Sequence, residues 1–181
     1  MSYHFAIVGT RDNPLFDLDF GTSKLGGDGL SHFKPEAAHM NQFILHASLD
    51  MVEEVQWANK DLYLKKIDSY QNNSIHCFLT ATNVKFLLLM NPDPSATPYS
   101  QHTPGTTTSP PPRAAANAKH SATLLAANPS SPQTEEAVRV FMGEVYESYV
   151  KCTLNPFYRA NQIITSPIFR SRVQAAAKKY L

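Results

Sequence analysis

The pattern of hydrophobic and polar positions predicts two strands near the N-terminus. Residues 3–9, YHFAIVG, form a short β-rich run that ends at a glycine. Residues 15–20, LFDLDF, alternate between bulky apolar side chains on one face and aspartates on the other, which is the period of a half-buried strand. Asp12, Asn13 and Pro14 supply a turn between the two runs. We therefore expect the runs to pair as an antiparallel hairpin.

Residues 36–57 carry the strongest helical pattern in the chain, and its apolar part is wide. Apolar side chains fall on two neighbouring stripes that cover about half of the circumference, whereas a helix on a sheet needs a stripe only about 100° wide. We expect the first stripe to pack on the sheet and the second to be available to another protein. The first stripe is Met40, Ile44, Ala47, Met51 and Val55. The second stripe and its polar rim are Leu45, Leu49, Val52, His46, Asp50 and Glu53.

Three further β-like runs follow at residues 62–70, 75–81 and 84–90. The short, turn-prone segments QNNS and TN separate them, so we expect a three-stranded antiparallel meander. The last run, VKFLLLM, is apolar on both faces, which is typical of a strand in the interior of a sheet.

Residues 91–134 differ in composition from the rest of the chain. They hold most of its prolines, many Ser, Thr, Ala and Asn residues, and almost no acidic or aromatic ones. Such a stretch cannot bury enough apolar surface to offset the entropy of ordering, so we expect a flexible insertion. One marginal helix within AAANAKHSATLLAA is the alternative. The Ser-Pro and Thr-Pro pairs raise the hypothesis of a regulated binding segment, beside that of a tolerated surface insertion.

Two helices are predicted at the C-terminal end. The helical period returns at Thr134, which can cap the helix, and lines one face with apolar residues as far as Cys152. This helix should end before Asn155 and Pro156, because the residue that precedes a proline is pushed towards an extended conformation. The last helix is expected to begin after Ser166 as its N-cap, with a proline at its first position.

Two aromatic residues follow the first of these helices at once, in the segment LNPFY. Because loops are usually polar, these side chains either cover the end of the core or anchor another protein. The chain must reverse there and a proline rigidifies the turn, so we expect Phe157 and Tyr158 to pack over the sheet, with the Tyr158 hydroxyl at the surface. A partner role for the motif Asn155, Pro156, Phe157 and Tyr158 is left open.

The predicted element order is β-β-α-β-β-β, the insertion, and then α-α. Layer packing favours a five-stranded antiparallel sheet with one long helix on one face and the two C-terminal helices on the other. We therefore expect the α+β class and a single domain over residues 1–181, interrupted at about 91–134.

Charge and cysteine content narrow the classes of function. The formal net charge is +1, without the basic stripe that indicates a nucleic-acid partner. Cys77 and Cys152 lie far apart in apolar patterns, which favours reduced thiols over a disulfide framework. The start, MSYHFAIVG, lacks the basic region of a signal peptide, and the longest apolar run is too short to span a bilayer. We expect a cytoplasmic protein.

No recognised catalytic motif, such as G-x-S-x-G or H-E-x-x-H, occurs in the sequence. His39 and His46 lack a third ligand at metal spacing, so we expect no metal and no other cofactor. His46 and Asp50 are four residues apart on the predicted helix, and we expect a hydrogen-bonded surface pair. The alternative is a small ligand-binding or enzymatic domain, in which this pair lines a cleft beside the glycine-rich residues 26–29.

Four segments give the chain a family likeness. The segments FAIVGTRDNPLFDLDF, HMNQFILHASLDMVEE, LNPFY and SPIFRSRV resemble the sedlin family, whose members are small subunits of the TRAPP vesicle-tethering complex with the longin fold. The likeness covers residues 3–90 and 136–181 in the same order, whereas the insertion departs from the family pattern. A longin/profilin-like fold is what this resemblance implies.

The resemblance also implies a function. Sedlin-like subunits are non-catalytic adaptors that link the core of the complex to larger accessory subunits, in ER-to-Golgi and Golgi transport and, in related forms, in autophagy. A Rab-type GTPase and the ER and Golgi membranes would be contacted indirectly, through the complex. Asp50 matches a family position at which substitution impairs assembly. A longin-type module that binds a SNARE-like helix or peptide is the alternative.

Overall fold

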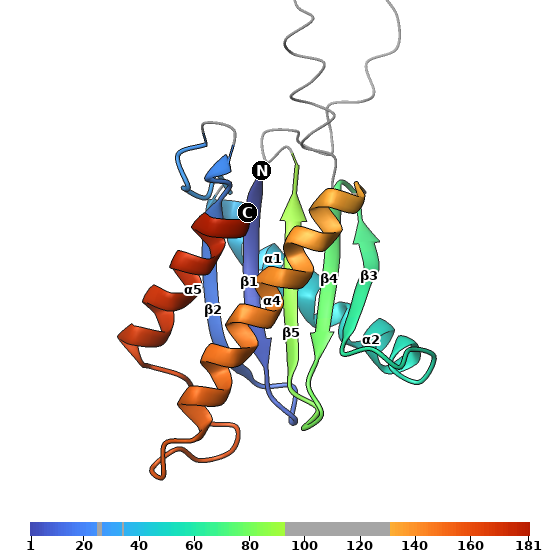
Figure 1. Cartoon of the computed structure of the whole chain (residues 1–181). Helices are drawn as coiled ribbons and strands as arrows, with labels where there is room; N and C mark the ends of the chain where they lie inside the picture. The colour runs from blue at the N-terminus through green and yellow to red at the C-terminus, as the bar shows by residue number, and fades with distance from the viewer. Residues whose placement is uncertain (25–26, 34, 93–130) are drawn as a thin grey trace, which may run out of the picture.

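Five antiparallel strands form one sheet in the spatial order β2-β1-β5-β4-β3 (Figure 1). The structure is a computed structural model that describes residues 1–24, 27–33, 35–92 and 131–181. The strands are β1 Ser2–Val8, β2 Pro14–Gly21, β3 Tyr63–Tyr70, β4 Asn73–Leu79 and β5 Lys85–Asn91. The hairpin, the meander and the α+β class predicted from the sequence are confirmed.

Strand β1 joins the N-terminal hairpin to the meander. It pairs with β2 on one side, from Ser2 opposite Gly21 to Ile7 opposite Phe16, and with β5 on the other. Strand β5 also pairs with β4, so the strand that was predicted to be interior has a neighbour along each edge. Every residue of β1 is buried, as expected of a strand in the middle of a covered sheet.

Helices cover both faces of the sheet (Figure 1). Helices α4 and α5 lie on one face, and α1 and α2 on the other. The helices are α1 Pro35–Ala47, α2 Leu49–Val55, α4 Pro132–Thr153 and α5 Pro167–Tyr180. The predicted arrangement of layers is therefore confirmed.

The sheet separates two hydrophobic cores. On the α4–α5 side, Phe5 of β1 packs edge to face against Phe86 of β5 and Phe141 of α4, with ring centroids 6.2 Å and 5.5 Å apart. On the α1–α2 side, the core contains Leu87 and Leu89 of β5 together with residues of both helices. Burying a side chain of this size stabilises the fold by about 1.5–3 kcal/mol. Successive side chains of β5 point to opposite faces of the sheet, so this one strand contributes residues to both cores.

The predicted helix over residues 36–57 is divided at Ser48. The Ser48 hydroxyl donates to the Leu45 carbonyl at 2.8 Å, and this local bond competes with the regular helical pattern. Ser48 keeps a helical backbone, with φ of −73° and ψ of −8°, so α2 follows α1 directly. The prediction of one long helix is corrected to two short ones, and Asp50 falls in the first turn of the second.

The C-terminal helices have serine N-caps. The Ser131 hydroxyl accepts the backbone N–H of Thr134 at 3.2 Å, so Ser131, and not Thr134, caps α4. Ser166 caps α5 and a proline follows it, as predicted. Helix α4 thus begins at Pro132, inside the range predicted as an insertion, and the expectations for residues 93–130 lie outside the described residues.

No helix in the described part of the chain is long and apolar enough to cross a membrane. Cys77 and Cys152 are both free thiols, as predicted.

Candidate functional site on helices α1 and α2

Helices α1 and α2 bury the stripe that was expected to face a partner. Leu45, Leu49 and Val52 are only 3%, 6% and 0% exposed, and they pack into the core on this side of the sheet. Of the other stripe, which was expected to pack on the sheet, only Ile44 is buried. Met51 and Val55 are half-buried and Met40 and Ala47 are exposed, so that expectation is wrong for the last two. The prediction that Leu45, Leu49 and Val52 form a free binding flank is therefore wrong.

The exposed side of the two helices carries Phe43, Ala47, Asp50 and Glu54. All four are exposed, whereas Leu45, Leu49 and Val52 of the same two helices are buried, so the four lie on the side that faces away from the sheet. Phe43 is 68% exposed although it is large and apolar. We refer to these four residues as the outer face.

The outer face combines apolar surface with negative charge. Asp50, Glu53 and Glu54 are all exposed, and so is His46. Within the described residues, the side chains of His46 and Asp50 form no hydrogen bond or ion pair, so the predicted pairing of these two residues is wrong. A charge that is exposed and unpaired adds little to the stability of the subunit. These side chains can therefore contact another molecule without cost to the fold.

The alternative of a cleft beside His46 and Asp50 gains no support. Both side chains are exposed, and neither lines any of four grooves that described residues form around α4. No group of three or more His, Cys, Asp or Glu side chains in the described ranges is placed to hold a metal ion. The geometry of the outer face suits contact with a macromolecule.

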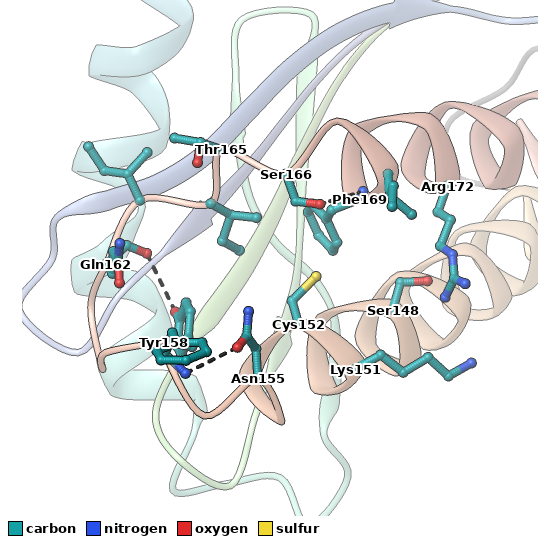
Figure 2. A pocket seen from close by; sticks show the side chains of 14 residues that line it. Ser148, Lys151, Cys152, Asn155, Tyr158, Gln162, Thr165, Ser166, Phe169 and Arg172 are labelled. Atoms are coloured by element: carbon teal, nitrogen blue, oxygen red, sulfur yellow. Dashed lines mark hydrogen bonds between the residues drawn. The ribbon is translucent and has the colours of Figure 1, made fainter.

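The segment LNPFY forms the turn that ends α4 (Figure 2). The side-chain oxygen of Asn155 accepts the backbone N–H of Phe157 at 3.1 Å, and its carbonyl oxygen accepts that of Tyr158 at 2.9 Å. Tyr158 is half-buried against the core, but Phe157 is 87% exposed. The prediction that both side chains pack on the core is confirmed for Tyr158 and wrong for Phe157. Hydrogen bonds to Asn155 hold this turn, so it does not need the Phe157 ring, and only one of the two adjacent side chains reaches the core.

The sequence contained a signal for the outer face that the stripe assignment missed. Phe43 is a large apolar residue on the polar side of the predicted helix, seven residues before Asp50 and therefore on the same side. Trp57, another seven residues on, is 86% exposed just beyond the end of α2. Large aromatic residues at exposed positions are enriched in protein interfaces.

These features define a small α+β domain with an exposed helix face that is both apolar and acidic. The chain belongs to the sedlin family, whose family model matches residues 7–179. It is 28% identical over 181 residues to the transport protein particle 20 kDa subunit of Schizosaccharomyces pombe, and the match covers 100% of both chains. It is 27% identical over 180 residues to the probable trafficking protein particle complex subunit 2 of Drosophila melanogaster, covering 99% of this chain and 97% of the relative.

Proposed function

We propose that this protein is a non-catalytic adaptor subunit of a trafficking protein particle complex that acts in vesicle transport. Its similarity to relatives that are named as subunits of such a particle extends from end to end of the chain. A role in ER-to-Golgi and Golgi transport, with membranes and a Rab-type GTPase reached through other subunits, is part of the proposal.

The outer face of α1 and α2 is the surface that we assign to a neighbouring subunit. The observation that carries this assignment is the exposure of Phe43 on the same side of the helices as Asp50. An exposed aromatic residue can supply affinity when it enters a pocket on a partner, because such anchors dominate binding energy. The carboxylates of Asp50 and Glu54 would then determine which partner is accepted and how fast it associates.

His46 and Glu53 lie next to the outer face and extend it with polar contacts. Leu45, Leu49 and Val52 keep a different role in this proposal: they anchor the helices on the sheet and so fix the direction in which the outer face points. A larger accessory subunit, joined through this face to the core of the complex, is the partner that we propose.

Affinity purification of the tagged full chain tests the proposal. Wild type is compared with Asp50→Tyr and with Asp17→Tyr, a matched change at an exposed aspartate on β2. We expect wild type and Asp17→Tyr to retrieve the same subunits, and Asp50→Tyr to lose about tenfold or more of at least one of them. Thermal unfolding of the three purified proteins is the control for folding.

Two outcomes would contradict the proposal. If wild type retrieves no subunit of the complex, the proposal that this protein belongs to the complex is wrong. Equal retrieval by wild type and Asp50→Tyr would remove the outer face from the interface.

A further inference from the structure

A groove of about 470 Å³ lies at the corner where α4 ends and α5 begins (Figure 2). The last turn of α4, the segment that joins the two helices and the first turn of α5 form its walls. The buried side chains of Ile164 and Phe169 and the half-buried Cys152 line its interior. The groove is thus formed where the two C-terminal helices meet, and it lies on the other side of the sheet from the outer face of α1 and α2.

Large apolar side chains form the rim of this groove. Phe157, Ile163 and Ile168 are 87%, 63% and 67% exposed. Single exposed apolar residues are common, but several around one depression mark a site of interaction with another molecule.

The charged groups of the groove are all cationic. Figure 2 shows Lys151 of α4 and Arg172 of α5 on its helical side, with the uncharged Gln162 and Thr165 on the opposite side. The residues that line it include no Asp or Glu. A ligand in this groove therefore meets exposed apolar side chains together with two positive charges and no negative one.

We propose that this groove binds a short segment of a partner protein that carries bulky apolar residues next to acidic ones. The apolar side chains of the segment would contact Ile163 and Ile168, and its carboxylates would pair with Lys151 and Arg172. The volume is within the range of about 300–1,000 Å³ that is typical of ligand sites. The strongly exposed rim favours a peptide, which extends beyond the groove, over a small molecule, which needs 70–90% of its surface enclosed.

Charge and shape favour a partner's peptide over three other occupants of the groove: residues 93–130 of the same chain, a lipid bilayer and a second copy of the chain. Residues 93–130 of the chain itself carry one acidic residue, Asp93, against Arg113 and Lys119, so their charge does not complement the groove. A bilayer is flat and can touch the rim but not the interior. A second copy could offer its acidic outer face, but that head-to-tail contact leaves both surfaces free at the ends and leads to open polymers.

A displayed library of random peptides, panned against the full wild-type chain, is the first part of the test. We expect the enriched peptides to combine aromatic or aliphatic residues with Asp or Glu. Dissociation constants of two synthetic peptides from the selection are then measured by fluorescence anisotropy. Enrichment of basic or purely polar peptides, or of none, would overturn the proposal.

Exposed residues of the groove supply the variants. We expect Ile168→Ser and the double change Lys151→Glu with Arg172→Glu each to raise the dissociation constant about tenfold or more. Lys178→Glu is the charge control, because it reverses one exposed positive charge, half of the change in the double variant, at the far end of α5, and it should leave binding unchanged. Asp50→Tyr should also leave it unchanged, so this test is independent of the proposed role of the outer face.

Two further measurements test whether a membrane or a second copy of the chain occupies the groove instead of a peptide. Sedimentation with vesicles of phosphatidylcholine and phosphatidylserine, and light scattering of the purified chain at increasing concentration, are run on the same proteins. Vesicle binding that Ile168→Ser abolishes would make the occupant a membrane, and self-association that it abolishes would make it a second copy. Either result would overturn the peptide proposal.

Discussion

Phe43 and Asp50 lie on the same exposed side of consecutive helices, seven residues or about two turns apart, while Leu45 and Leu49 between them point into the core. One stretch of chain thus serves two purposes. Its inner side fixes the helices on the sheet, and its outer side presents an aromatic ring and a carboxylate to the surroundings. Because the two sides share no side chains, changes on the outer side can be made without damage to the fold.

Substitutions on the buried and the exposed side of α1 should differ in their effect on the free energy of unfolding. We expect Leu45→Ala to lower the free energy of unfolding by about 2–5 kcal/mol, because it leaves a cavity in a packed core. Phe43→Ser should change it by only about 0.5 kcal/mol, since most of that side chain is already in water. Urea unfolding of the isolated chain measures both. Equal losses in the two variants would contradict the assigned orientation of the helix.

A buried histidine should make stability depend on pH. Burial lowers the pKa of His76 from 6.5 to about 4, and its Nδ1 lies 2.9 Å from the Tyr63 hydroxyl. Because the unfolded chain takes up this proton first as the pH falls, the stabilising contribution is present above pH 6.5 and is lost between pH 6.5 and about 4.

The size of this effect follows from the shift in pKa. Between pH 7 and pH 5, His76 should remove about 2 kcal/mol from the free energy of unfolding. Urea unfolding of wild type and His76→Gln at both pH values isolates the contribution, because all other groups are shared. If both proteins lose the same amount over this range, His76 is not neutral in the folded state.

The two thiols should differ in reactivity. Burial raises the pKa of Cys77 to about 12, so only about one molecule in ten thousand carries the thiolate at pH 8. Burial also raises the pKa of Cys152, but that side chain is only half-buried. With Ellman's reagent at pH 8 we expect one slow reacting thiol in the folded protein and two in denaturant. Cys152→Ser should remove the slow one, and a fast reaction of Cys77 would contradict its placement in the core.

The sequence predicted the elements well because their patterns are local. The strict alternation of residues 15–20 and the apolar run of residues 84–90 each identified a strand and, in the second case, its interior position. The serine and proline that start α5 were equally readable, since a cap depends only on its own turn. These features needed no knowledge of distant contacts.

The orientation of the helices could not be predicted, because it depends on the sheet. Two apolar stripes were visible, but which residues become buried depends on how many strands the helices cross and at what angle. At the break, the Ser48 hydroxyl donates a local hydrogen bond to the Leu45 carbonyl. Phe157 and Tyr158 are adjacent in the chain, and only the geometry of the Asn155 turn decides that Tyr158 reaches the core.

The most direct measurement is the quantitative recovery of complex subunits with Phe43→Glu and Leu30→Glu. Both changes replace a large, strongly exposed apolar side chain with a charge, at 68% and 66% exposure, so both variants should fold like wild type. We predict that Phe43→Glu loses the neighbouring subunit that Asp50→Tyr loses, and that Leu30→Glu retains it. Recovery of that subunit by Phe43→Glu at the wild-type level would contradict the assignment of the outer face as the interface.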